Sequence, residues 1–480
     1  MSLPVLDGEF TMKQLIVIIL LITTFFGCNT NENTCGHAFI GGEIINPNNK
    51  YVTLYRDASP IDTLYLDENN RFSYQIESLN PGLHSFNHGG EYQVVIIEPN
   101  DSIMIRLNTI DFHESLVFSG LGSKKNNYLI NMFLKLDQEE HFVYQVSKLS
   151  PEIFLAKLDS IKDEKYQSLN AFKEKYLPTD YFINVAKTGI DYSYYRDKEI
   201  YAYRYFGINE PLPLDSLPSG YFDFRKEIDY NREELKEFYP YFNFLFPHFN
   251  NLAMEKYFKD NAEKKLVRTN INYHLNKLEL IDDMVESDVM KNILLKFPTI
   301  NFLNYSTSFE DSEAMFNSYI EKNTSKQNAD YVTNIYRTLN RLRPGNNVPD
   351  IEILNIKNEV ATLNSVTKKP TILYFWTSAN QYHFKNSHAK VKELKTLYPS
   401  IDFISININS NNEPNWKLLL KQNNIDVTNE YRFRNPEIAK KLLAIRYINK
   451  VIVVDRNNNI ISSNANLFKS DFKVLLDNIK

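Results

Sequence analysis

The sequence predicts a multidomain α+β protein with an N-terminal antiparallel β-sandwich, a helical middle region and a C-terminal α/β domain. The first observation is length, because 480 residues exceed what one hydrophobic core usually accommodates. The second is the apolar pattern, which changes along the chain from short alternating runs to a helical period and then to alternating strands and helices. With 43% hydrophobic and 24% charged residues, the composition is that of a folded protein.

Residues 37–122 are expected to form a small β-sandwich. Segments such as YVTLYRD and SIMIRLN show alternation or short apolar runs. The segments DENNRF and EPNDS separate them as turns, because Asn and Asp bond to their own backbone and tolerate left-handed geometry. Short strands separated by such turns predict two antiparallel sheets that pack against each other.

Residues 123–345 are expected to be helical. Ser150 is a suitable N-cap, Pro151 occupies the first helical position and Glu152 follows in the first turn, before apolar residues at every third or fourth position. Prolines between residues 178 and 298 predict a division into about eight to ten short helices. The Pro-Gly break in LRPGNNVP, residues 342–349, predicts the boundary to the next domain.

Residues 346–480 alternate between strand and helix patterns. TILYFW is a continuous apolar run suited to a central strand, and DFISINI predicts a second strand. NSHAKVKELKTLYP and NWKLLLKQNN are helical, and VIVVDRNNNII predicts a hairpin with an Asn-rich turn. DFKVLLDNI predicts a closing amphipathic helix.

The order and spacing of PGNNVPDIEI, KKPTILYFWTSANQYH, IDFISININ and VIVVDRNNNII resemble the TlpA-like branch of thioredoxin folds. The β-rich residues 37–122 also resemble the small β-domain that often precedes thioredoxin folds in Bacteroidota lipoproteins. The resemblance implies a thioredoxin-like fold for residues 346–480. It assigns no chemistry to the N-terminal β-domain.

The residues of the family's redox site are missing. In that family, the strand-ending Phe-Trp is followed by a turn and then by Cys-x-x-Cys at the start of a helix. Alignment on this pair places the two cysteine positions on Asn380 and His383, and Asn449 and Lys450 stand where the cis-proline is expected. Because disulfide exchange needs a thiolate and a resolving thiol, dithiol catalysis at this position is excluded.

What remains at the redox position is a candidate binding site, made of Trp376, Asn380, Gln381, Tyr382 and His383 together with Asn449 and Lys450. A helix N-terminus offers free N–H groups and the positive end of the helix dipole, which suits an anion or a peptide carboxylate. The other interpretation, which we favour from the sequence alone, is that these are surface residues of a scaffold turn. His383 has the chemistry of a general base.

No metal or cofactor is expected. His383 and His388 are five residues apart, which is not the four-residue spacing that places two ligands on one helix face. His84 and His88 in HSFNH are expected to lie on a solvated loop. No Gly-rich phosphate loop, G-x-S-x-G or H-E-x-x-H motif is found in the sequence.

Residues 192–207, YSYYRDKEIYAYRYFG, form an aromatic tract with two interpretations. Exposed rings would suit the binding of sugars or peptides. The alternative is the packed core of a helix, since Tyr194, Tyr201 and Tyr205 share one helical face. We favour the core.

The N-terminus predicts a secreted, lipid-anchored protein. From Met12, the expected start, one lysine precedes the apolar run Leu15–Phe26, which is too short for a transmembrane helix and fits a signal peptide. Gly27-Cys28 then resembles the lipobox of bacterial lipoproteins, which implies a signal peptide over residues 1–28, lipidation of Cys28 and a tether over residues 29–36. The alternative is an uncleaved N-terminal anchor.

The resulting hypothesis is a cell-envelope lipoprotein, on the outer membrane or the periplasmic face, whose redox-inactive thioredoxin-like domain binds a protein or peptide as a scaffold. Surface exposure also stays open. The alternative is an enzyme: a relative of thiol-disulfide oxidoreductases or a redox partner, which would use Cys35, or a hydrolase that uses His383. Carbohydrate uptake is a third possibility. The net charge of −5 argues against a nucleic-acid partner.

Overall fold

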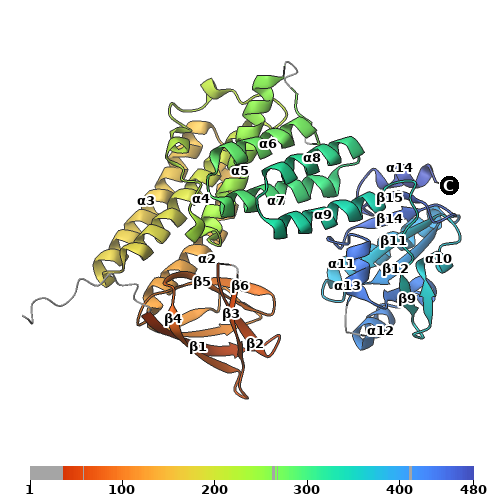
Figure 1. The fold of residues 1–480 in the computed structure, drawn as a ribbon, viewed down its shortest axis with the longest axis horizontal. Coiled ribbons are helices and arrows are strands. Elements are labelled where there is room, and N and C mark those ends of the chain that lie inside the picture. Colours follow the sequence, from red (N-terminus) through yellow and green to blue (C-terminus); the bar gives the residue numbers. More distant parts are fainter. Residues whose placement is uncertain (1–35, 58, 262–264, 268, 410–412, 480) are drawn as a thin grey trace, which may run out of the picture. The chain divides into compact units, whose positions relative to one another are not determined.

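The computed structural model describes residues 36–57, 59–261, 265–267, 269–409 and 413–479 (Figure 1). The described residues form two compact units, which fall within residues 1–139 with 172–184 and within residues 140–171 with 185–480. The predicted signal peptide, the start at Met12, the lipidation site Cys28 and the second cysteine, Cys35, lie outside the described residues. These expectations, and the predicted domain boundaries, stay predictions.

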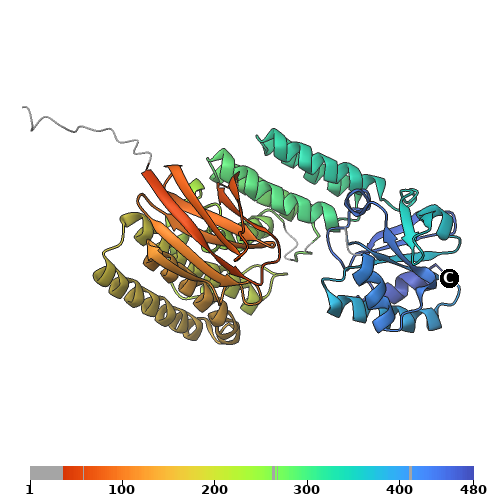
Figure 2. The ribbon, with the colours of Figure 1, turned by 90° about the horizontal axis from the view of Figure 1, so that it is seen from below.

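The β-region consists of two four-stranded sheets, ordered β4-β1-β7-β8 and β3-β2-β5-β6 (Figures 1 and 2). Both sheets contribute to one apolar core, for example through Ile40 and Ile103 from the first sheet and Val52 and Phe86 from the second. The strands are β1 Gly36–Ile45, β2 Tyr51–Arg56, β3 Ser59–Tyr65, β4 Arg71–Leu79, β5 Gly82–His88, β6 Glu91–Ile97, β7 Ser102–Asn108 and β8 Val117–Leu121.

The expectation of a purely antiparallel sandwich is wrong at one pairing. Strands β1 and β7 are parallel, with Phe39 opposite Ser102, whereas the other pairings in the two sheets are antiparallel. The two predicted turns are confirmed, because Asn70 and Asn100 adopt left-handed backbone angles (φ 58° and 68°).

The expectation that His84 and His88 lie on a solvated loop is also wrong. Both are in β5 and are buried (2% and 0% exposed). The His84 Nδ1 atom is 3.0 Å from the Gly82 carbonyl, and burial lowers the pKa of His84 to about 4. His88 accepts a hydrogen bond from the Asn48 amide and lies within hydrogen-bond distance of the Tyr51 carbonyl. Both histidines are therefore parts of the β-region's interior.

The middle region is helical, as predicted, but its helices are longer than expected. The first three contain 24, 26 and 27 residues. The helices are α2 Ser123–Val146, α3 Pro151–Tyr176, α4 Asp180–Phe206, α5 Tyr239–Asp260, α6 Ile271–Met284, α7 Asp288–Tyr305, α8 Phe309–Lys322 and α9 Lys326–Arg341, with short 3-10 turns at Leu214–Ser216, Asp223–Glu227 and Glu233–Leu235. None of the described helices is both long and apolar enough to cross a membrane.

Two of the prolines expected to separate helices lie inside them. Pro247 is within α5 and Pro298 is within α7. An interior proline removes one backbone hydrogen bond, so packing must offset the cost. Both prolines lie between buried neighbours, such as Phe244 and Phe249 in α5 and Leu295 and Phe302 in α7. Burial of these apolar side chains explains why the helices continue.

The aromatic tract of residues 192–207 lies on α4 and is mostly core, as favoured. Tyr192, Tyr201 and Tyr203 are buried, and Tyr201 stacks on Phe154 with ring centroids 3.8 Å apart. Tyr205 is 41% exposed. The packing of these rings accounts for their number without a sugar ligand.

The C-terminal region is an α/β domain around a seven-stranded sheet ordered β10-β9-β13-β12-β11-β14-β15. Strands β11, β12 and β13 are parallel, and β14 runs antiparallel to β11. The strands are β9 Glu352–Asn355, β10 Val360–Thr362, β11 Thr371–Trp376, β12 Asp402–Asn407, β13 Glu430–Phe433, β14 Val451–Val454 and β15 Ile460–Ala465. The helices are α10 Leu363–Val366, α11 Gln381–Leu397, α12 Glu413–Gln422, α13 Pro436–Leu442 and α14 Phe472–Asp477, with a 3-10 turn at Val427–Asn429.

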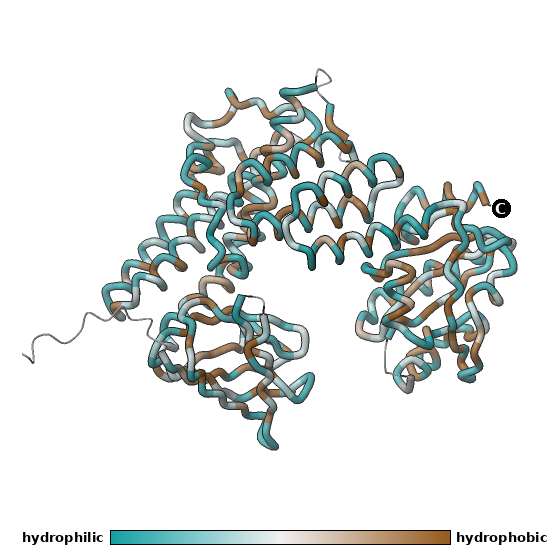
Figure 3. The backbone as a smooth tube through the Cα atoms, in the orientation of Figure 1, coloured by the Kyte–Doolittle hydropathy of each residue, from teal (hydrophilic) through white to brown (hydrophobic). Residues whose placement is uncertain are grey.

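Helices cover both faces of this sheet. On one face, Ile372 and Tyr374 of β11 pack with Leu394 of α11 and Leu476 of α14. On the other face, Phe375 of β11 packs with residues of α13 and α10. The central strands are accordingly hydrophobic along their length (Figure 3). The end of β11 and the start of α11 are therefore fixed by contacts with the buried core of the domain.

Candidate functional site

The candidate site lies where β11 ends and α11 begins. Asn380 is the N-cap of α11, and its side-chain oxygen accepts a hydrogen bond from the His383 amide at 2.9 Å. The two positions aligned with the family's cysteines are therefore the N-cap and the third residue of the helix. The sequence-based expectation of a helix N-terminus at this position is confirmed.

The outer part of this helix start faces solvent. Asn380, Gln381 and Asn449 are exposed, and the Tyr382 side chain is 81% exposed. Within the described part of the chain, no hydrogen bond to the backbone amides of Gln381 and Tyr382 is found. A large exposed aromatic ring beside free N–H groups is an arrangement that a peptide or protein can contact.

His383 lies under this surface. It is 8% exposed, and its ring is 6.1 Å from the ring of Phe468. Burial, with the nearby His388, lowers the pKa of His383, while a hydrogen bond with Asn449 acts in the opposite direction. His383 and Asn449, which are far apart in sequence, are thus brought together. The lowered pKa favours the neutral imidazole, which has no ion-pair partner among the described residues.

His388 has a different environment and belongs to a buried pair. Its Nε2 atom is 3.1 Å from Glu430 Oε1, and its Nδ1 atom donates to the Phe384 carbonyl at 2.8 Å. Because Nδ1 is used as a donor, the contact with Glu430 requires a proton on one of the two groups. Glu430 is 3% exposed and also raises the pKa of the buried Tyr374, after burial itself as the main cause. Glu430 was not identified from the sequence, since nothing in EYRF marks it.

The remaining predicted residues are buried structural elements. Trp376 is fully buried and packs on Phe384 with ring centroids 4.5 Å apart. Lys450 is 6% exposed, its ammonium donates to the Ala444 carbonyl at 3.2 Å, and burial lowers its pKa to about 8. Neither offers a surface to a large ligand.

The described residues contain no group of three or more His, Cys, Asp or Glu side chains arranged to hold a metal ion. The geometry at the start of α11 therefore supports contact with a peptide backbone or an anion, and supplies no thiol.

A central sheet with helices on both faces and a helix starting directly after the central strand defines the class of this domain. Residues 368–460 match the thioredoxin-like family model. The C-terminal domain is therefore a thioredoxin-like domain. No curated protein matches the chain.

Several solved structures from Bacteroides are similar to part of the chain. A protein assigned as a thiol-disulfide oxidoreductase from Bacteroides vulgatus is 21% identical over 29% of this chain and 99% of that one, with a TM-score of 0.27. The C-terminal domain of a protein with the same assignment from Bacteroides thetaiotaomicron is 24% identical over 29% and 97%, with a TM-score of 0.26. A thiol-disulfide oxidoreductase from Bacteroides fragilis is 17% identical over 27% and 98%, with a TM-score of 0.24. At these identities and TM-scores, the similarities support no conclusion about the activity of this chain.

Proposed function

We propose that this protein is a lipoprotein of the cell envelope, anchored through Cys28, whose thioredoxin-like domain binds a protein or peptide and performs no thiol exchange. The anchor rests on the apolar run before Gly27-Cys28. The binding role rests on the start of α11.

The absence of thiol chemistry is supported by the positions of the cysteines. The chain has two, Cys28 and Cys35, and both precede the first strand. Asn380 and His383 occupy the cysteine positions of the family, and neither side chain forms or resolves a disulfide. Any redox role would therefore depend on Cys35.

The single observation that carries the binding role is the exposure of Tyr382. Tyr382 is the second residue of α11, and its side chain is 81% exposed. The inner face of this helix packs against the buried sheet. Aromatic side chains held on rigid elements are frequent anchors of protein interfaces. Free amides at the same helix end add hydrogen-bond donors for a carboxylate or a peptide carbonyl.

The test is extraction of the tagged full chain from its native membrane in mild detergent, followed by identification of proteins that co-purify in fixed ratio. The experiment compares wild type with Tyr382→Ser. Tyr65→Ser is the matched control, because Tyr65 is an equally prominent surface tyrosine (74% exposed) on β3.

We expect a partner with wild type and with Tyr65→Ser, and a loss of at least about tenfold in recovery with Tyr382→Ser, as for an aromatic hot spot. Recovery of the same partner by all three proteins would remove the start of α11 from the interaction. Absence of any partner from wild type would overturn the binding role.

The second candidate function is that of a redox partner acting through Cys35. It is favoured only by the presence of this thiol within the predicted tether, residues 29–36. Cys35→Ser separates the two functions, because it removes the redox role and leaves the binding surface of α11 intact.

A further inference from the structure

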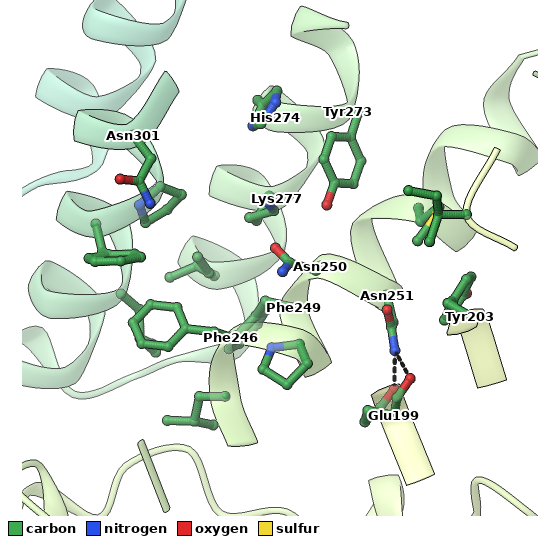
Figure 4. A pocket seen from close by; sticks show the side chains of 18 of the residues that line it. Glu199, Tyr203, Phe246, Phe249, Asn250, Asn251, Tyr273, His274, Lys277 and Asn301 are labelled. Atoms are coloured by element: carbon green, nitrogen blue, oxygen red, sulfur yellow. Dashed lines mark hydrogen bonds between the residues drawn. The ribbon is translucent and has the colours of Figure 1, made fainter. Parts of the chain in front are cut away.

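The helical region contains a partly open pocket of about 430 Å³ between α4, α5, α6 and α7, which is called the cavity below (Figure 4). A volume of this size is typical of small-molecule sites. Most of its wall is apolar and aromatic, including Leu245, Phe246, Phe249, Met254, Ile281 and Phe297. The cavity is separate from the candidate site at the start of α11.

Both helix-interior prolines of α5 and α7 line this cavity. Pro247 and Pro298 each lack the N–H group that would bond to the carbonyl one turn earlier. The two helices therefore give up a backbone hydrogen bond at the cavity wall.

The cavity contains a buried lysine with no anionic partner. Lys277 of α6 is 7% exposed, and no hydrogen bond or ion pair of its ammonium is found in the described part of the chain. Its ammonium lies 4.5 Å from the centre of the Tyr273 ring. Burial lowers the pKa of Lys277 to about 7. By contrast, the buried Lys125 contacts two carboxylates at 2.6 Å.

Two amide side chains accompany this lysine. Asn250 of α5 and Asn301 of α7 line the same cavity, and their side chains make no hydrogen bond to other described residues. In Figure 4 the amide of Asn250 points toward Lys277, and Asn301 projects from the neighbouring helix. Asn251 is different, because it donates to Glu199. The cavity therefore offers one ammonium and two free amides within an apolar wall.

We propose that this cavity binds a small molecule with an apolar body and a single carboxylate, held by the ammonium of Lys277 and the amides of Asn250 and Asn301. A buried cation without a partner favours an anionic ligand, because the ligand supplies the missing charge. The apolar body of the ligand packs against the aromatic and aliphatic side chains of the cavity wall. One cation matches one negative charge, so a monocarboxylate is preferred over a dianion.

The other titratable groups that face the cavity do not supply this charge. They are Glu199 and Tyr203 of α4 and Tyr273 and His274 of α6, and no titratable residue of α5 or α7 lines it. Glu199 is already paired with Arg225 at 2.6 Å. Lys277 therefore has no competing anion among these groups.

The test is calorimetric titration of the full chain with 3-phenylpropionate and with its uncharged counterpart 3-phenylpropanamide. Wild type is compared with Lys277→Met. Lys198→Met is the matched control, because Lys198 is also buried (6% exposed) beside an aromatic ring, Tyr221, and does not line the cavity. Asn250→Leu is a second variant that keeps the lysine.

We expect 3-phenylpropionate to bind wild type and Lys198→Met alike, and to bind Lys277→Met at least about tenfold more weakly, as for a charge-assisted hydrogen bond. Asn250→Leu should weaken binding about fivefold, as for a neutral hydrogen bond. Binding of the amide should not depend on Lys277. No binding of the carboxylate to wild type, or equal binding to wild type, Lys277→Met and Asn250→Leu, would overturn the proposal.

Discussion

The two sides of the helical cavity bury opposite charges in very different ways. On α4, the Glu199 carboxylate is fully buried and accepts hydrogen bonds from His248, Arg225 and Asn251 at 2.6–2.8 Å. On α6, Lys277 is almost as buried and has no such partner among the described residues.

The contrast separates a structural charge from a charge available to a ligand. Burial would raise the pKa of Glu199, but the hydrogen bond from His248 and the charge of Arg225 lower it. The chain thus stabilises the charged form of Glu199. For Lys277, burial acts alone and lowers the pKa, so the chain destabilises the charged form. Substitution of such a group by an apolar residue should therefore stabilise the fold. Its presence is explained if the group binds a ligand.

Removal of the satisfied charge should have the largest effect. Glu199→Gln removes the main anionic partner of the Arg225 guanidinium, which is 13% exposed and also pairs with Glu255. We expect the free energy of unfolding of the helical region to fall by about 3 kcal/mol or more. Urea unfolding followed by far-UV circular dichroism measures it.

Glu234→Gln is the control for this prediction. Glu234 is 43% exposed at the side chain and pairs with Arg232, so its loss should cost less than about 1 kcal/mol. Equal effects of the two substitutions would show that burial of Glu199 does not determine its contribution.

The pair His388–Glu430 should behave like Glu199 in the other domain. His388→Leu removes the hydrogen bond to Glu430 and leaves a buried carboxylate, at a cost of about 3 kcal/mol. Both tryptophans of the chain, Trp376 and Trp416, lie in the thioredoxin-like domain, so tryptophan fluorescence during urea unfolding reports this domain alone. A shift no larger than that of the exposed control Glu437→Gln would contradict the prediction.

Removal of the unsatisfied charge of Lys277 should stabilise the protein. The change in the free energy of unfolding should be smaller than the losses expected for Glu199→Gln and His388→Leu. The pKa of Lys277 is about 7 when folded and near the ordinary 10.5 when unfolded, so the unfolded chain binds one more proton between these values. The cost is therefore fully present below about pH 7 and disappears as the pH rises toward 10.5. The pKa difference of about 3.5 units corresponds to at most about 5 kcal/mol. Loss of the contact between the ammonium and the Tyr273 ring offsets part of this gain, so we expect Lys277→Met to raise the free energy of unfolding at pH 7 by on the order of 2 kcal/mol.

Far-UV circular dichroism during urea unfolding at pH 7 and at pH 10 checks this result. The difference between wild type and Lys277→Met should shrink at the higher pH. A destabilised variant, or a difference that does not change with pH, would mean that Lys277 has a partner within the fold.

The smallest effect is expected at the exposed helix start. Asn380→Ala removes the hydrogen bond to the His383 amide and should cost about 1 kcal/mol in the thioredoxin-like domain. Gln381→Ala, which removes no capping bond, is the control. Tryptophan fluorescence during urea unfolding compares them, and equal midpoints for both variants would show that the cap contributes nothing.

Local chemistry made much of the fold predictable. The turns at Asn70 and Asn100 follow from the tolerance of asparagine for left-handed backbone, and the helix after Ser150 follows from its cap and Pro151. The apolar run TILYFW is the fully buried strand β11. Each of these signals lies within a few residues of the structure it specifies.

Long-range contacts were not predictable in the same way. Glu199 meets Arg225 and His248, which are 26 and 49 residues away, and His388 meets Glu430 at a separation of 42. Lys277 had a usable signal, because it lies four residues after Tyr273 and four before Ile281, on the apolar face of α6. A charged residue on an apolar stripe is a reason to look for a cavity.

Reduction of insulin disulfides by dithiothreitol, in the presence of the purified full chain, tests the proposal that the thioredoxin-like domain performs no thiol exchange. We expect the rate of the reductant alone for both wild type and Cys35→Ser, because no cysteine lies in the domain. A faster rate with wild type that Cys35→Ser abolishes would contradict it and assign a redox role to Cys35.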